Sequence, residues 1–260
     1  MNVNKIIQEY PEDYCSMLEF TYGKGMMSEG GVEAIDNMFA GINLNQKKCL
    51  DIGFGLAGAA HHLAATYGTY VTGLEINPRM VMEANKTIPS PLKKLLHFVT
   101  SENFPNIPFS TNEFDIAYSK GVFVHLEEKQ EAFNEMYRVL KPKGSFIIDD
   151  WLSPHDNAWS DGVKKLCEME DLSLFSTSEK TYLATLKHAG FKNIQTKNVS
   201  QEYSQYNLKI VERLMDKKVA TIFQKKFSEK LWHDSIECYQ LIADAMKDNE
   251  IIVMNMRAEK

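Results

Sequence analysis

The sequence predicts an α/β protein whose core is a doubly wound, mostly parallel sheet of seven strands. Short continuous apolar runs alternate with helical patterns from residue 47 to residue 199. These runs lack the strict polar alternation of a half-exposed strand, as expected for parallel strands that are covered on both faces. A glycine-rich turn also joins the first run directly to a helix. The alternation therefore predicts helices on both faces of the sheet.

The individual elements follow in chain order. The predicted strands are 47–53, 69–76, 95–100, 114–119, 145–150 and 191–199. The predicted helices between them are 56–68, 77–88, 127–140 and 177–190. Gly68 ends the first of these helices, and Asn77 with Pro78 marks the start of the second. Thr177 or Ser178 opens the last one.

Both ends of the chain are predicted to be helical additions to one domain, 1–260. In the first 45 residues the clearest helix is 30–42. Residues 201–260 are expected to hold two amphipathic helices and then a last strand, with the helices packed over the sheet edge that carries the site. We therefore divide the domain into a helical lid (1–45), a core that carries the ligand site (46–200) and a cap with the final strand (201–260).

Composition excludes several classes of function. The net charge of −6 and the pI near 5.7 argue against broad binding to nucleic acid. The four cysteines, at 15, 49, 167 and 238, show neither a C-x-x-C pair nor zinc spacing, so we expect free thiols and no metal. The polar N-terminus and the lack of an apolar run of about eighteen residues predict a cytoplasmic protein without a signal peptide or membrane partner.

The glycine-rich turn is the most informative segment. It reads Asp-Ile-Gly-Phe-Gly-Leu-Ala-Gly at 51–58 and lies between a strand and a helix. Gly53 permits a tight turn, and Gly55 lets the backbone approach a ligand because no Cβ intervenes. Together with Gly58 they satisfy the G-x-G-x-x-G pattern, and the helix beyond offers free N–H groups. The turn is therefore predicted to bind a cofactor.

Two acidic residues indicate which cofactor it binds. Asp51 would repel a pyrophosphate but suits a ligand with an ammonium and a sulfonium. Glu75 ends the next strand, where a carboxylate can bind both ribose hydroxyls. This pair of acids around the turn resembles the signature of class I S-adenosylmethionine-dependent methyltransferases. An NAD-linked dehydrogenase is a weaker alternative, because it shares only the glycine pattern.

The ends of the first four strands are predicted to converge on one crevice. After the third strand, Glu102 or Asn103 is placed to reach an adenine amino group, although a solvated loop is the alternative. Ile76, the last residue of the second predicted strand, and Ser119 and Lys120, at the end of the fourth, are assigned to the same cofactor site.

Longer motifs extend the resemblance to one family. They include L-E-F-T-Y-G and M-M-S-E-G-G-V-E-A-I near the start, C-L-D-I-G-F-G, F-D-I-A-Y-S-K-G-V-F-V-H-L and K-P-K-G-S-F-I-I-D-D-W. Over nearly its whole length the chain resembles the phosphoethanolamine N-methyltransferase family in its short, single-domain form. The S-x-G-G element from Ser28 to Gly31 is more specific than the glycine-rich turn.

The resemblance implies a Rossmann-like fold, S-adenosylmethionine as cofactor with S-adenosylhomocysteine as product, and several residue roles. It implies that Tyr10 closes over the substrate and that His125 pairs with it as general base. It implies that Met27 and Ser28 line the cofactor. These roles agree with the chemistry, because methyl transfer chiefly requires alignment, exclusion of water and one proton acceptor. A histidine needs little adjustment to accept a proton near neutral pH.

The chain departs from the family where the acceptor would bind. Gly121 replaces an aspartate, and no late lysine equivalent is found. The positions that match the family's phosphate-binding tyrosines and arginine hold Trp151, Leu166, Glu170 and Leu172, and Leu18 is assigned to the same site. An arginine fork is the favoured device for binding phosphate, whereas Glu170 would repel it and tolerate an amine. A solvent-facing position on a helix is the alternative for Glu170.

The sequence therefore predicts a methyltransferase that acts on a small molecule, with an amine nitrogen as acceptor. A second hypothesis is phosphoethanolamine methylation proper, in which Lys164 or Lys165 contacts the phosphate. A third is a non-catalytic module that binds S-adenosylmethionine and serves as a scaffold for a partner. The acceptor's identity, the number of methyl groups transferred and the oligomeric state stay open.

Overall fold

The computed structural model describes residues 3–260, which contain one seven-stranded sheet. The strands are β1 (Lys48–Ile52), β2 (Tyr70–Glu75), β3 (Leu96–Thr100), β4 (Phe114–Lys120), β5 (Leu140–Leu152), β6 (Lys192–Asn198) and β7 (Ile252–Glu259). Their order across the sheet is β3-β2-β1-β4-β5-β7-β6. Neighbouring strands are parallel except where β7 pairs with β5 and β6. The predicted doubly wound, mostly parallel sheet is therefore confirmed.

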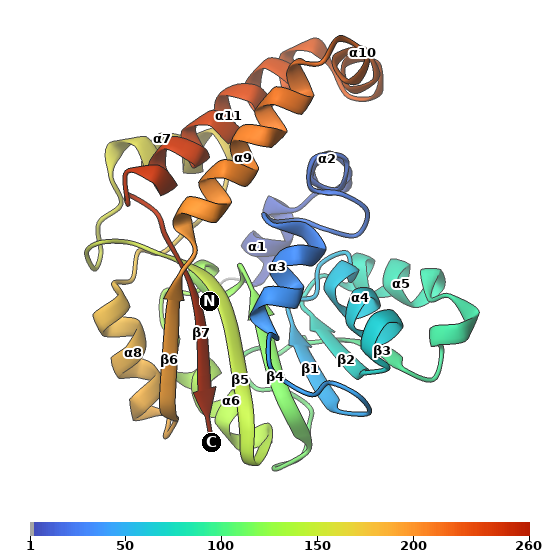
Figure 1. Ribbon diagram of the computed structural model, residues 1–260, viewed down its shortest axis with the longest axis vertical. Helices are drawn as coiled ribbons and strands as arrows, with labels where there is room; N and C mark the ends of the chain where they lie inside the picture. Colours follow the sequence, from blue (N-terminus) through green and yellow to red (C-terminus); the bar gives the residue numbers. More distant parts are fainter. Residues whose placement is uncertain (1–2) are drawn as a thin grey trace.

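Helices cover both faces of this sheet (Figure 1). One face carries α3 (Gly31–Met38), α4 (Gly58–Tyr67) and α5 (Pro78–Thr87), and the other carries α6 (Gln130–Val139) and α8 (Glu179–His188). Each face has its own apolar core, centred on Leu63 on the first face and on Phe133 and Phe146 on the second. Complete burial of one such side chain contributes about 1.5–3 kcal/mol, so the two cores stabilise the sheet from both faces.

Local capping explains where several helices begin. The side chain of Asn77 accepts a hydrogen bond from the amide of Arg79 at 3.1 Å, so the predicted start of α5 is confirmed. Ser178, one of the two predicted residues, caps α8 through the amide of Thr181. Strand β5 is longer than the predicted 145–150 at both ends. Its pairing with β7 continues to Leu152, and it begins opposite β4 at Leu140.

A third group of helices lies beyond the carboxyl ends of the parallel strands (Figure 1). These helices are α1 (Val3–Glu9), α2 (Glu12–Tyr22), α7 (Asp161–Glu170), α9 (Ser200–Met215), α10 (Lys217–Lys226) and α11 (Glu229–Lys247). The prediction of two helices after residue 200 is wrong, because there are three. Asp216 caps α10 and Ser228 caps α11, so the amphipathic stretch is interrupted twice, whereas two helices require one interruption.

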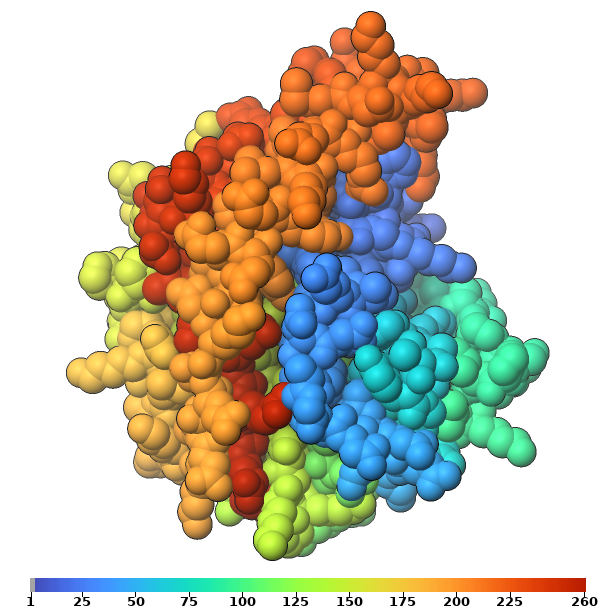
Figure 2. Space-filling view, viewed as in Figure 1, coloured from blue at the N-terminus to red at the C-terminus, as the bar shows by residue number. Residues whose placement is uncertain are grey.

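The N-terminal helices and the cap share one apolar core that holds them together. Met17, Leu18 and Tyr22 of α2 are buried in this core with Tyr239 of α11. The hydroxyl of Thr21 also lies 2.8 Å from that of Tyr239. Figure 2 shows the N-terminal residues (blue) packed between the cap (orange) and the body. Within residues 3–260, no helix combines the length and apolarity that crossing a membrane requires.

Candidate active site

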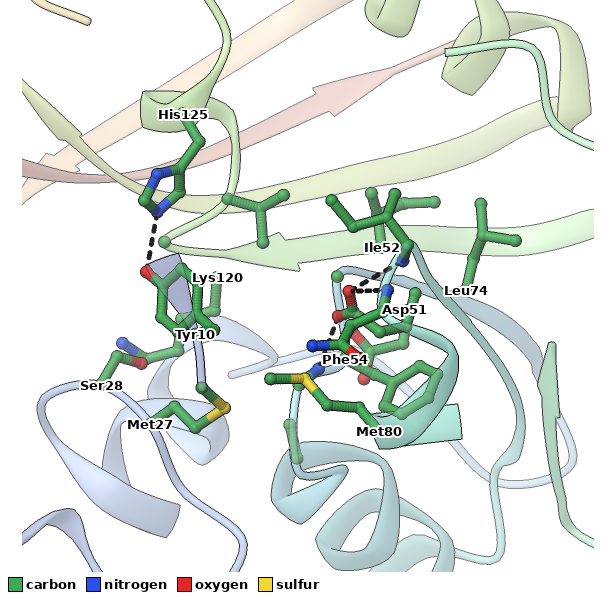
Figure 3. A pocket seen from close by; sticks show the side chains of 18 of the residues that line it. Tyr10, Met27, Ser28, Asp51, Ile52, Phe54, Leu74, Met80, Lys120 and His125 are labelled. Carbon is green, nitrogen blue, oxygen red and sulfur yellow. Dashed lines mark hydrogen bonds between the residues drawn. The ribbon is translucent and has the colours of Figure 1, made fainter. Parts of the chain in front are cut away.

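Two neighbouring cavities lie at the carboxyl edge of the sheet, where β1 and β4 are adjacent and the strand order reverses. The first cavity is bounded by the ends of β1, β2 and β4 and by the N-terminal segment (Figure 3). Its lining includes the predicted residues Tyr10, Met27, Ser28, Asp51, Gly53, Gly55, Glu75, Ile76, Lys120, Gly121 and His125. The structure therefore brings most of the predicted cofactor residues together.

Asp51 lies one residue before the end of β1 and faces the first cavity with a buried carboxyl group. The hydroxyl of Tyr118 donates a hydrogen bond to its Oδ2 at 2.8 Å. Burial raises the pKa of Asp51 to about 7, although the bond from Tyr118 opposes the shift. A buried carboxylate without a cation is unfavourable, so this group is suited to a ligand that brings an ammonium.

Glu75 ends β2 and is fixed by backbone donors. Its Oε2 accepts from the amide of Gly55 at 3.1 Å, and its Oε1 accepts from the amides of Ile76 and Asn77 at 2.8 and 3.0 Å. Burial raises the pKa of Glu75, and these three bonds oppose the shift. A carboxylate has about four acceptor sites, so Glu75 retains capacity for a hydroxyl of a bound nucleoside.

The glycine-rich turn has the backbone geometry that its sequence predicts, with φ of 68° at Gly53 and 56° at Gly55. Gly58 has a different role from the one expected of a dinucleotide fingerprint. Its amide donates to the carbonyl of Gly25 at 2.9 Å, and a Cβ at Gly58 would lie 2.4 Å from that oxygen. The third glycine therefore lets the segment before Met27 pack onto the start of α4.

Tyr10 and His125 line both cavities and contact each other at their junction (Figure 3). The Tyr10 hydroxyl lies 3.0 Å from Nε2 of His125, and Nδ1 lies 3.2 Å from the carbonyl of Ser173. Because a carbonyl only accepts, we assign the ring proton to Nδ1, which leaves Nε2 as the acceptor. Burial lowers the pKa of His125 and raises that of Tyr10, so both side chains are neutral.

The second cavity holds the residues predicted for the acceptor. Its lining includes Leu18, Gly121, Trp151, Leu166, Glu170 and Leu172. Glu170 accepts a hydrogen bond from the hydroxyl of Tyr14, so it faces the cavity and not the solvent. Among residues 3–260, Lys120 is the only lysine or arginine in this lining, and its Nζ lies 3.3 Å from Oδ1 of Asp149.

Three cofactor predictions are not supported by this geometry. Glu102 and Asn103 are exposed and line neither cavity. The amide of Ser101 bonds to the carbonyl of Glu75 at 2.8 Å, which keeps Ser101 in the cavity wall while the next two residues turn into solvent. Ser119 is buried but lines neither cavity, because strand alternation turns it away from the side that Lys120 occupies.

The two lysines of the second hypothesis also lie outside the site. Lys164 and Lys165 are exposed, and each forms a surface ion pair, with Asp161 and Glu237 respectively. Neither lines the second cavity. Residues 3–260 contain no group of three or more His, Cys, Asp or Glu side chains that is arranged to hold a metal.

Sequence reasoning missed several residues of the site. Tyr14, Glu29 and Asp149 line the second cavity, and Tyr118 holds Asp51 in the first. A signal existed for Tyr118, because it lies two residues before Lys120 on the same strand and so points to the same side. No local pattern marks Asp149, whose position depends on the pairing of β5 with β4.

Comparison with known proteins shows which proteins this chain is similar to. Residues 50–148 match the family model described as a methyltransferase domain. The chain is 30% identical over 227 residues to a phosphoethanolamine N-methyltransferase of Plasmodium falciparum, covering 85% of this chain and 82% of that protein. It is 31% identical over 158 residues to a glycine/sarcosine/dimethylglycine N-methyltransferase of Actinopolyspora halophila, covering 60% of this chain and 27% of that protein.

A solved structure of phosphoethanolamine N-methyltransferase 2 from Haemonchus contortus, with phosphomonomethylethanolamine and S-adenosylhomocysteine, superposes with a TM-score of 0.89. The sequence identity is 20%, and the match covers 99% of this chain and 60% of that one. The fold and the site define a class I S-adenosylmethionine-dependent methyltransferase. Within this class, the chain belongs to the phosphoethanolamine N-methyltransferase family.

Proposed function

We propose that the enzyme methylates the nitrogen of a small amine, with His125 as general base and the N-terminal helices as a lid that Tyr10 closes. The observation that carries this proposal is the position of His125. Its unprotonated Nε2 lies at the junction of the two cavities, where a cofactor on one side and an acceptor on the other would meet.

The first cavity fits S-adenosylmethionine, which supplies a sulfonium-activated methyl group when bound. In our proposal Asp51 binds the ammonium of the cofactor, and Glu75 binds the ribose hydroxyls. Support comes from the buried Asp51 carboxyl, which lacks a cationic partner among residues 3–260, and from the acceptor capacity left on Glu75. Met27, Ser28 and Ile76 form the adjoining wall.

The proton of the acceptor has a defined route. As the nitrogen gains a methyl group it loses one proton to the hydroxyl of Tyr10, which passes its own proton to Nε2 of His125. The phenol stays neutral before and after the transfer, as its raised pKa requires. The carbonyl of Ser173 accepts from Nδ1 throughout and so stabilises the imidazolium that forms.

The second cavity favours an amine over a phosphate ester. Phosphate is best bound by an arginine fork. Among residues 3–260, the only lysine or arginine that lines this cavity is Lys120, and it is already paired with Asp149. Methylation of phosphoethanolamine is a second candidate, because the relatives from Plasmodium and Haemonchus carry that name.

A product assay decides between these candidates. Purified enzyme and S-adenosylmethionine are incubated with an alkylamine, a matched alkyl alcohol or phosphoethanolamine, and the methylated product is identified by mass spectrometry. We expect methylation of the amine and none of the alcohol. Preferred methylation of phosphoethanolamine would favour the second candidate, and methylation of the alcohol would contradict a nitrogen acceptor.

A further inference from the structure

Glu170 belongs to the part of the second cavity that is not shared with the first. Tyr10, Met27, Ser28, Lys120, Gly121 and His125 line both cavities, whereas Glu170, Tyr14 and Trp151 line the second cavity alone. We propose that the acceptor carries a second, positively charged nitrogen, remote from the nitrogen that is methylated, and that Glu170 binds it. This inference rests on the proposed function and narrows its substrate to a diamine.

The local field at Glu170 favours a cation. Glu170 is the last residue of α7, and the carboxyl end of a helix carries partial negative charge. The hydroxyl of Tyr14 donates to Oε2 and fixes the carboxylate in the cavity wall. Among residues 3–260, no lysine or arginine forms an ion pair with Glu170. The carboxylate therefore has an oriented site for an ammonium and no cation of the protein's own to fill it.

The charges around the cavity are also unbalanced. Three carboxyl groups line it, those of Glu29, Asp149 and Glu170, although burial raises the pKa of Glu29 and so disfavours its charge. The single ammonium in the lining, that of Lys120, pairs with Asp149. Buried carboxylates are stabilised by a cation that enters with the ligand. A substrate with one cationic nitrogen would offset part of this excess.

Glu9 is an independent sign of the same imbalance. It is 5% exposed, and neither of its carboxyl oxygens has a hydrogen-bond partner among residues 3–260. Its charge acts on Tyr10, His125 and Cys167, all of which line the second cavity, so its carboxyl group lies behind that wall. A buried carboxylate without a hydrogen-bond partner is unfavourable, and a cation in the neighbouring cavity would stabilise it.

Aromatic rings complete the environment. Tyr10, Tyr14, Tyr22 and Trp151 all line the second cavity. Aromatic faces attract cations, most strongly where water is excluded. The two ends of the cavity therefore suit different nitrogens. At the junction the Lys120 ammonium disfavours a second charge and His125 accepts a proton, so a neutral amine reacts there. The part of the second cavity beside Glu170 binds the charged nitrogen.

Calorimetry and kinetics with matched probes test this proposal. The probes are α,ω-diaminoalkanes of three to five carbons and the n-alkylamines of the same lengths. We expect at least one diamine to bind the complex with S-adenosylhomocysteine tenfold or more tightly than its matched monoamine, and to be methylated with a correspondingly higher kcat/KM. Equal binding and turnover of all matched pairs would overturn the inference while leaving amine methylation intact.

The variant Glu170→Gln keeps the shape of the side chain and removes its charge. We expect it to reduce the preference for the diamine over the monoamine tenfold or more, in both assays. Glu168→Gln, an exposed change on the same helix, should leave the preference unchanged. An unchanged preference in a folded Glu170→Gln variant would contradict the assignment. If the cofactor binds and no amine is methylated, the proposed function fails and this inference with it.

Discussion

The hydroxyl of Tyr10 lies 3.0 Å from Nε2 of His125, although 115 positions separate the two residues in the chain. Their rings also meet edge to face, with centroids 5.7 Å apart. The guanidinium of Arg79 donates to the backbone carbonyl of Tyr10 at 3.3 Å and fixes it above α5. The contact between Tyr10 and His125 therefore joins the N-terminal helices to the segment after β4 at the junction of the two cavities.

Loss of the proposed base is the most direct test of this contact. We expect His125→Ala to lower turnover roughly a hundredfold or more, because general-base catalysis contributes factors of about 10² to 10⁴. Affinity for the cofactor should change only a few fold. Steady-state kinetics give the first quantity, and calorimetry with S-adenosylhomocysteine gives the second.

His188→Ala is the matched control, because His188 is exposed at the end of α8 and lines neither cavity. It should leave both quantities unchanged. Normal turnover in His125→Ala would reduce His125 to a packing role.

The charge of Glu9 should be visible in the pH dependence of activity. Burial and the nearby Lys129 lower the pKa of His125, whereas Glu9 and the carbonyl of Ser173 raise it. In the proposed mechanism His125 acts in its deprotonated form, so kcat/KM should rise with pH through that pKa. Glu9→Gln removes a raising influence, and the acid limb of the kcat/KM profile should move to lower pH.

The same acceptor is used for both enzymes in that experiment, so its own titration cancels in the comparison. Glu12→Gln, which removes an exposed carboxylate a few residues away, should leave the profile in place. A limb that stays fixed or moves to higher pH in Glu9→Gln would show that Glu9 does not support the base.

Much of the fold was predictable because its signals are local. The cap at Asn77 and the continuous apolar runs of the parallel strands depend on neighbours in the sequence, and the structure has them where expected. Only one of the two helix breaks after residue 200, at Asp216 and Ser228, was expected, because a polar residue inside an amphipathic stretch reads as part of one helix surface. The early start of β5 at Leu140 depends on pairing with β4, which no local pattern reveals.

The site was predictable to the extent that strand ends define it. Asp51 and Glu75 follow directly from strand boundaries, and both face the first cavity. Glu102 and Asn103 were misplaced because a loop's course depends on its own bonds, here that of Ser101 to Glu75. The second cavity is built between distant segments, so only the family resemblance pointed to Glu170.

Cofactor binding should depend on pH through Asp51. With a pKa of about 7 in the free protein, Asp51 is protonated below that pH and must lose its proton to bind an ammonium. Affinity for S-adenosylmethionine should therefore rise between pH 5.5 and pH 7, below the value of about 7.7–8 at which an α-amino group titrates. Calorimetry in buffers of different ionisation enthalpy should detect proton release in this range.

The variant Asp51→Asn should abolish that proton release and weaken cofactor binding at pH 7.5 by roughly thirtyfold or more, or about 2 kcal/mol. Asp115→Asn is the control, because Asp115 lies on β4 but lines neither cavity. If the wild-type affinity did not depend on pH, or if Asp51→Asn bound the cofactor normally, Asp51 would not be the residue that binds the cofactor's ammonium.

The packing of the N-terminal segment onto α4 depends on Gly58. A Cβ there would lie 2.4 Å from the carbonyl oxygen of Gly25, whose hydrogen bond from the Gly58 amide it would displace. We expect Gly58→Ala to lower the free energy of unfolding by about 1–3 kcal/mol, the usual effect of overpacking, and to weaken cofactor binding because Met27 moves with Gly25. Urea denaturation and calorimetry measure the two effects. Gly162→Ala, whose Cβ would meet only side-chain atoms, Oε2 of Glu250 at 3.2 Å and Oγ of Ser160 at 3.8 Å, should change stability by less than about 1 kcal/mol. If Gly58→Ala were as stable as this control and bound the cofactor normally, the packing of the N-terminal segment would not depend on the contact between Gly58 and Gly25.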